Sequence, residues 1–133
     1  MDKKLVTART IALEVLDEVF ADKAYSNIAL NKHLSRHQDL SSKDRGLVTE
    51  LVYGTVARKI TLEWYLSHYI EDRDKLAPWV YYLLMMSLYQ SIYLDKVPNH
   101  AVVNSAVEIT KRRQGKHQGI HRLVNAVLRR LTD

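Results

Sequence analysis

The chain has 133 residues, of which 47% are hydrophobic and 26% are charged, a balance typical of a folded domain and not of a disordered segment. It contains no cysteine, which excludes disulfides, thiolate metal sites and cysteine nucleophiles in this chain and fits a reduced, cytoplasmic location. The net charge of +5 lies entirely in the last third. Residues 1–94 carry 12 basic and 12 acidic side chains, whereas residues 95–133 carry 8 basic and 3 acidic ones. This asymmetry indicates a polyanionic partner.

Two features of the sequence predict a high helical content: few helix-breaking residues and the spacing of the apolar residues. Only four glycines and two prolines interrupt the chain, which favours helices joined by short connections. Apolar residues recur at helical spacing, and no stretch shows the sustained alternation of a strand. The expected helices cover about residues 5–21, 27–37, 41–58, 61–70, 78–94, 101–113 and 120–132. The predicted fold is all-α: an orthogonal bundle of about seven helices in a single domain over residues 1–133.

Local signals mark the starts of the second and third helices. Ser26 or Asn27 can cap the second helix, and Ser41 with Asp44 forms a capping-box pattern at the third. The third helix also contains Gly46 and Gly54, each of which costs about 1 kcal/mol relative to alanine. We therefore expect another helix to cross closely at both glycines.

The fifth predicted helix begins at Pro78 and is apolar on nearly all sides, so it is expected at the centre of the core. Its apolar stretch, 79–94, is too short and too polar for a membrane span. Large side chains on this helix are expected in the core, although in another interpretation they form an exposed surface that binds a protein. These residues are Tyr81, Tyr82, Met85, Met86 and Tyr89.

The sequence contains no pattern that composes a catalytic or metal site. Two histidine pairs, His33/His37 and His117/His121, have the four-residue spacing of helical metal ligands, but neither has an intervening glutamate or an evident third ligand. We expect these histidines to face solvent. The second pair could add pH-dependent charge to a phosphate site. The carboxylates lie on polar faces or beside lysines and arginines, which is typical of solvated charge.

The basic segment near the C-terminus is the most informative feature. Lys111, Arg112 and Arg113 end a helix, where cations also favour the helix dipole, but this does not explain Lys116 and Arg122. Several phosphate contacts of this kind give salt-dependent, weakly sequence-selective binding of nucleic acid. The alternative is a solvated or protein-facing patch. The candidate RNA-binding residues are Lys3, Lys4, Arg9, Lys111, Arg112, Arg113, Lys116, Arg122, Arg129 and Arg130.

The composition of this basic segment limits how it could contact nucleic acid. It has no aromatic residues interleaved with its cations, so base stacking by the segment is not expected.

Asn104 and Asn125 stand in mid-helix beside valines, where a buried amide needs partners. We expect each to bond to backbone at a helix end or loop.

With these residues in view, four blocks of the sequence resemble the NusB-like domain. They are Tyr25-Ser-Asn-Ile-Ala-Leu-Asn-Lys32, Lys43-Asp-Arg-Gly-Leu-Val-Thr-Glu-Leu-Val-Tyr-Gly-Thr55, Pro98-Asn-His-Ala-Val-Val-Asn-Ser-Ala-Val107 and Val124-Asn-Ala-Val-Leu-Arg-Arg130. The resemblance covers nearly the whole chain. It is greatest to the version of this domain at the N-terminus of bacterial 16S rRNA cytosine-5 methyltransferases of the RsmB (Sun/Fmu) type.

The resemblance implies two three-helix subdomains around a shared core and a role in RNA binding. In those methyltransferases a Rossmann-like catalytic domain follows, which binds S-adenosylmethionine and uses cysteines. This chain has neither and stops after its last helix, as an excised domain would. The implied function is that of a non-catalytic accessory domain that contacts 16S rRNA and its own C-terminal methyltransferase domain. Six residues match family motif positions and are expected to be structural or interface residues: Arg45, Glu50, Gly54, Arg58, Asn104 and Asn125.

The main alternative is a free-standing transcription antitermination factor of the NusB type, which binds RNA together with a ribosomal protein. The first two blocks favour the methyltransferase domain over this factor. A third hypothesis, outside RNA binding, is a helical module for protein interaction built on the tyrosines and methionines of the fifth helix.

Overall fold

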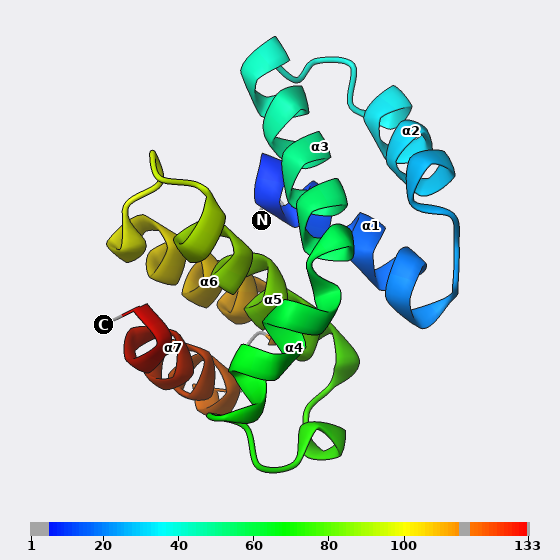
Figure 1. Ribbon diagram of the computed structural model, residues 1–133. Coiled ribbons are helices and arrows are strands. Elements are labelled where there is room, and N and C mark those ends of the chain that lie inside the picture. The colour runs from blue at the N-terminus through cyan, green and yellow to red at the C-terminus, as the bar shows by residue number, and fades with distance from the viewer. Residues whose placement is uncertain (1–5, 115–117, 133) are drawn as a thin grey trace. The chain divides into compact units, whose positions relative to one another are not determined.

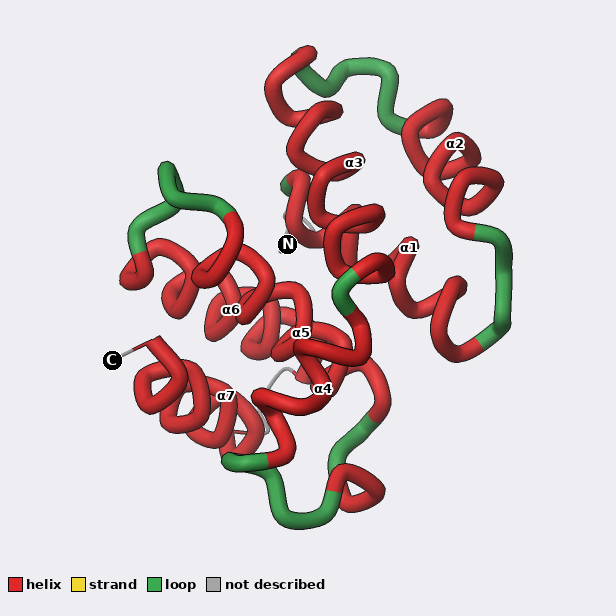
Figure 2. Tube along the Cα trace, viewed as in Figure 1, coloured by secondary structure: helices red, strands yellow, loops and turns green. Residues whose placement is uncertain are grey.

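The computed structural model describes residues 6–114 and 118–132, and within them it contains helices and no strand (Figure 2). The expected all-α fold is therefore confirmed, and seven α-helices lie in these residues. They are α1 (Ala8–Ala21), α2 (Ser26–Arg36), α3 (Ser42–Ala57), α4 (Lys59–Ser67), α5 (Pro78–Tyr93), α6 (Asn99–Gln114) and α7 (Gln118–Thr132), with a 3-10 helix at Arg73–Lys75.

The chain divides into two compact units at residues 57 and 58. Unit 1 contains α1, α2 and α3, all of which pack against one another (Figure 1). Unit 2 contains α4 to α7, one helix more than the three that the resemblance implies.

The helices of unit 1 begin and end where specific side chains satisfy the backbone. Thr7 and Thr10 form a reciprocal capping box, in which each side-chain oxygen accepts from the other residue's backbone N–H, at 3.2 and 2.8 Å. The helix α1 therefore begins at Ala8, later than the apolar pattern alone predicts. The expected serine or asparagine cap of α2 is wrong, because Tyr25 occupies the cap position without a side-chain bond.

The connection between α2 and α3 depends on one arginine. Arg45 donates from Nη1 to the carbonyl oxygens of Leu34 and His37, at 3.3 and 3.2 Å, and so satisfies two carbonyls at the end of α2. Ser41 Oγ accepts from the backbone N–H of Asp44 at 3.1 Å, which confirms Ser41 as the cap of α3.

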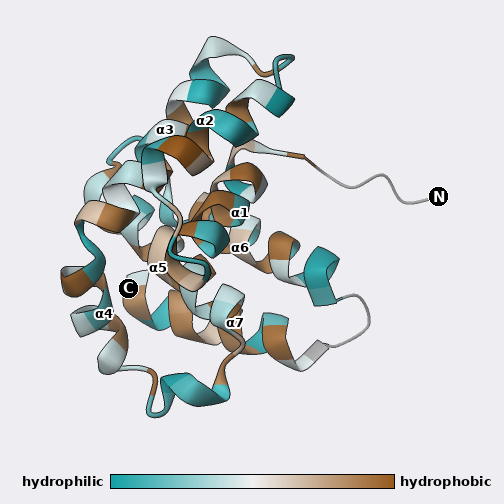
Figure 3. Cartoon of the chain, turned by 90° about the vertical axis from the view of Figure 1, so that its right-hand side faces the viewer, coloured by the Kyte–Doolittle hydropathy of each residue, from teal (hydrophilic) through white to brown (hydrophobic). Residues whose placement is uncertain are grey.

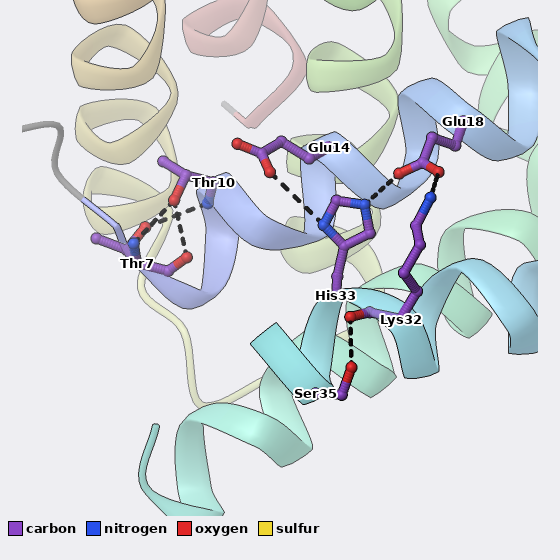
Figure 4. A network of polar contacts seen from close by, with 7 residues as sticks. All are labelled: Thr7, Thr10, Glu14, Glu18, Lys32, His33 and Ser35. Carbon is purple, nitrogen blue, oxygen red and sulfur yellow. Dashed lines mark hydrogen bonds and ion pairs between the residues drawn. The ribbon is translucent and has the colours of Figure 1, made fainter. Parts of the chain in front are cut away.

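A charged cluster joins α1 to α2, and Figure 4 shows it closely. His33, only 6% exposed, contacts Glu18 through Nε2, and its Nδ1 lies 3.6 Å from Glu14. Lys32 forms a second ion pair with Glu18. The expectation that His33 faces solvent is therefore wrong. It followed from spacing alone, whereas the partners of His33 lie on a different helix.

Glu18 is the acceptor that holds this cluster together. Partial burial acts to raise the pKa of Glu18, but hydrogen bonds from Lys32 and His33 outweigh that effect and hold the pKa below its usual value. A carboxyl group with a lowered pKa in the folded state stabilises the fold above its unfolded pKa, and this stabilisation is lost as the pH falls through the folded value.

Glu18→Gln tests this role, because glutamine keeps the shape of the glutamate side chain and removes its negative charge. We expect it to lower the free energy of unfolding by about 1–2 kcal/mol at about pH 6, since charge-assisted bonds are lost. The difference from the wild type should shrink at a second, lower pH, below the unfolded-state pKa of about 4.3, because the stabilisation is lost as the pH falls through the folded-state pKa of Glu18. Urea unfolding followed by circular dichroism measures both. The exposed Asp39→Asn is the matched control, and an equal loss for Glu18→Gln at both pH values contradicts the account.

Unit 2 is built around α5. Every residue from Val80 to Gln90 is buried, and α4, α6 and α7 all pack against this helix. The predicted central position is confirmed. The five large residues named for a possible interaction surface are buried, with Tyr82 the most exposed of them at 8%, so the protein-interaction hypothesis loses its proposed surface. No helix in the described ranges is long and apolar enough to cross a membrane.

Gly46 shows a second difference from the sequence expectation. The position is exposed, and a Cβ added to Gly46 would meet nothing within 4 Å. The expected close helix crossing is therefore wrong at this glycine, which only weakens α3.

We accordingly expect Gly46→Ala to stabilise the chain by about 0.5–1 kcal/mol, because alanine restricts the unfolded backbone and favours the helix. Thermal unfolding should show a rise in Tm of a few degrees, about 2–6 °C. An unchanged or lower Tm would mean that another part of the chain packs against this position.

Candidate nucleic-acid interface

The helices α6 and α7 form an antiparallel hairpin. They lie side by side (Figure 1), and the Asn99 side-chain amide at the start of α6 donates to the Thr132 carbonyl at the end of α7, at 3.1 Å. We call residues 99–114 and 118–132 the α6–α7 hairpin. It contains six of the ten candidate RNA-binding residues.

Helical periodicity separates the two faces of α7. Val124, Val127 and Leu128 are buried, whereas Arg122 and Arg129, seven residues apart, share the exposed face. Burying an arginine without a partner is costly, so the buried valines and leucine fix which way the arginines point.

The cations of α6 cluster in its last turn. Lys111, Arg112 and Arg113 are all exposed, and Figure 3 shows the hydrophilic end of this helix. Arg112 pairs with Glu108 one turn earlier, with Arg112 Nε 3.3 Å from Glu108 Oε1. Glu108 is the one carboxylate in residues 99–114 and 118–132, so the hairpin carries six cations against one anion.

The antiparallel arrangement divides these cations into two groups. Lys111, Arg112, Arg113 and Arg122 lie where α6 leads to α7, which we call the turn end. Arg129 and Arg130 lie beside the start of α6, which we call the terminal end. Arg122 and Arg129 are about 10 Å apart along the axis of α7. The structure therefore distributes the charge over the length of the hairpin.

Aromatic rings support two of the arginines, one in each group. The guanidinium carbon of Arg113 lies 5.2 Å from the ring centre of Trp79, and that of Arg130 lies 5.3 Å from the ring centre of Tyr69. Neither ring belongs to the basic segment. The rings come from α5 and from the residues after α4, so the expectation that the segment itself does not stack on bases stays a prediction.

Elsewhere in unit 2 a carboxylate compensates the cations. Glu63 pairs with Lys59 at 3.0 Å and with Arg73 at 2.6 Å. Burial acts to raise the pKa of Glu63, but hydrogen bonds from Lys59 and Arg73 dominate and lower it. Arg73 also lies over the ring of Tyr81, at 4.1 Å. The uncompensated positive charge of unit 2 thus concentrates on the hairpin.

The four remaining candidate residues do not belong to residues 99–114 and 118–132. Lys3, Lys4 and Lys116 lie outside the described residues. Arg9 lies on α1 in unit 1 and is half-buried; burial lowers its pKa, while the charge of Asp44 acts to raise it.

The family-motif residues have varied surroundings. Arg58, directly before α4, lies 4.8 Å over the ring of Tyr93. Glu50 is exposed on α3, and Gly54 lies near the end of that helix. The expected backbone bonds of the two asparagines are wrong. Asn104 is exposed, and Asn125 Oδ1 accepts from Arg129 Nε at 3.0 Å.

Sequence reasoning missed an exposed apolar surface on α4. Ile60 is 83% exposed and Trp64 59%, and Trp64 makes edge contacts with Tyr65 and His68. The aromatic content of this short helix was visible in the sequence, but not which side would remain uncovered.

No metal centre emerges from the parts of the chain that the structure describes. Those parts contain no group of three histidine, cysteine, aspartate or glutamate side chains arranged to hold a metal ion. His121 is half-buried on α7, and His117 lies outside the described residues.

Comparison with known proteins assigns the family. The NusB family pattern matches residues 6–133, almost the entire chain. The chain belongs to the NusB family. Its relatives include a protein of Bacillus subtilis called probable ribosomal RNA small subunit methyltransferase B, 47% identical over 126 residues. A protein of the same name from Synechocystis is 36% identical over 128 residues, and a ribosomal RNA small subunit methyltransferase B from Thermus thermophilus is 35% identical over 125 residues.

The extent of these matches is unequal. They cover 94 to 95% of this NusB-family chain but only 28 to 30% of the relatives. The chain therefore spans less than a third of the length of the proteins that it resembles.

Proposed function

We propose that this NusB-family chain is a non-catalytic RNA-binding domain that helps to dock a 16S rRNA cytosine-5 methyltransferase on its substrate. One observation carries the proposal: six exposed cations and one carboxylate occupy the α6–α7 hairpin, while residues 1–94 are electrically balanced. Phosphate groups are the partners that such a surface attracts most strongly.

The geometry suits backbone contact more than base reading. The two groups of cations are spread along one hairpin, so they can contact successive phosphates of one strand and fix its course. Arg113 and Arg130 are supported by rings, which reduces the conformational entropy that each loses on binding. Such contacts position an RNA strand without reading its sequence.

The catalytic step belongs, in this proposal, to the part of the parent protein that lies outside this chain. The relatives are named methyltransferases, and this chain covers about 28% of the first two. S-adenosylmethionine and the reactive cysteines are accordingly expected in a C-terminal methyltransferase domain, which is the second partner of this domain after RNA. Such a protein acts on ribosomal RNA and is expected in the cytoplasm. The antitermination factor is disfavoured, since the relatives above are all named methyltransferases.

The first test removes two cations of the turn end, Lys111 and Arg122, which are exposed and do not pair with a carboxylate among the described residues. We expect Lys111→Ala with Arg122→Ala to weaken binding of a 16S rRNA fragment about tenfold at low salt. The slope of log affinity against log salt concentration should decrease by about 1.5, because two phosphate contacts are lost. Fluorescence anisotropy across a salt series measures both quantities.

The matched control removes two exposed cations of unit 1, Arg36 and Lys43, for the same change in net charge. Its affinity should fall by about twofold or less, since long-range attraction alone is reduced. Glu108→Gln should act in the opposite direction and strengthen binding, because it removes the one carboxylate of residues 99–114 and 118–132 and so reduces repulsion of phosphate. Equal effects of the two double variants would contradict a hairpin interface.

A further inference from the structure

A small pocket with several polar side chains in its lining opens at the terminal end of the hairpin. Its volume is about 210 Å³, and it is lined by Asn99, His100, Val103, Asn104, Arg129 and Thr132. The first four residues belong to α6 and the last two to α7. The pocket therefore forms only when the two helices pack, and both helices contribute polar groups to it.

The walls of this pocket are held in place before any ligand arrives. Asn99 donates its side-chain amide to the Thr132 carbonyl, at 3.1 Å, which joins the two helices beside the pocket. Arg129 donates from Nε to Asn125 Oδ1, at 3.0 Å, which fixes the root of its guanidinium group. Val103 is 5% exposed and provides a packed apolar base. Such preorganisation lowers the entropy cost of binding.

The chemistry of the lining selects an anion with several oxygens. Arg129 offers a planar fork of donors, Asn104 an exposed amide, and His100 a ring N–H. Among the described residues that line the pocket, none is acidic. A phosphate group accepts hydrogen bonds from several directions at once, so it matches donors that come from two helices.

The neighbouring arginine has a different environment. Arg130 follows Arg129 directly, carries the same charge and is also exposed, yet it lies over the ring of Tyr69 and does not line the pocket. General attraction for RNA would use both arginines alike. A defined phosphate-binding pocket would use Arg129 and not Arg130.

We propose that this pocket binds one phosphate group of the RNA backbone and fixes the position of the strand at the terminal end of the hairpin. The proposal rests on the proposed function and adds to it a defined anchor, set by Arg129, His100 and Asn104. The cations of the turn end then contact further phosphates of the same strand.

The central experiment compares Arg129→Gln with Arg130→Gln, which remove the same charge from adjacent positions. We expect Arg129→Gln to weaken binding of a 16S rRNA fragment about tenfold, and Arg130→Gln about two- to threefold. Asn104→Asp, which is nearly isosteric and places a negative charge in the pocket, should weaken binding at least as much as Arg129→Gln. Circular dichroism confirms that each variant is folded.

A second measurement observes the pocket directly. Inorganic phosphate is added to the ¹⁵N-labelled chain at constant ionic strength, with sodium chloride as the reference. The side-chain amide signals of Asn99 and Asn104 should shift with phosphate in the wild type and in Arg130→Gln, but not in Arg129→Gln. The RNA fragment should displace the phosphate.

The outcomes distinguish the phosphate pocket from RNA binding by the chain as a whole. Equal effects of the two arginine variants, with RNA still bound, would overturn the pocket and leave the RNA interface standing. Phosphate shifts that RNA cannot displace would also overturn the proposal, because the pocket would then hold a free phosphate compound. If the wild type binds no RNA even at low salt, the proposed function itself is overturned.

Discussion

The arrangement of unit 2 depends on one constraint: α5 is buried over eleven successive residues, from Val80 to Gln90. A helix that is apolar on all sides cannot face water, so it must be covered by other helices. In this chain α4, α6 and α7 pack against it. Each covering helix turns an apolar face inward, and its charged residues remain on the other side.

The positive surface follows from that constraint. The helices α6 and α7 use valines, alanine, isoleucine and leucine to face their neighbours, and the cost of burying charge keeps Arg122 and Arg129 outside. The tight hairpin then aligns cations that are up to 19 residues apart in sequence, from Lys111 to Arg130. The charge asymmetry of the chain thus becomes two groups of exposed cations, one at each end of the hairpin.

Contacts between arginines and aromatic rings recur in unit 2. Four arginines lie over aromatic rings within its described residues: Arg58, Arg73, Arg113 and Arg130. The guanidinium carbons lie 4.1 to 5.3 Å from the ring centres, within the range in which a ring attracts a cation. Stacking restrains the long side chains while the guanidinium edges remain able to bond to an anion. The basic surface is consequently more rigid than its composition suggests.

The features that could be predicted from the sequence are those that depend on the local spacing of residues. The seven helices, the central position of α5 and the basic segment all follow from patterns within a few residues, and each was located to within a few positions. The family resemblance was visible for the same reason, since its four blocks are continuous.

What the sequence did not predict depends on partners that lie far apart in the chain. His33 is buried against Glu18, 15 residues away on another helix, and Trp79 supports Arg113 from the start of α5. No pattern within one helix specifies which residue of another helix will lie opposite.

The central claim, that RNA lies along the outer face of the α6–α7 hairpin, is tested most directly by mapping the contact surface. The ¹⁵N-labelled chain is titrated with a single-stranded 16S rRNA fragment, and the backbone amide shifts of both units are followed. The account predicts the largest shifts on the exposed faces of α6 and α7, from the turn end to the terminal end. Shifts confined to α1, α2 and α3, with the hairpin unchanged, would contradict it.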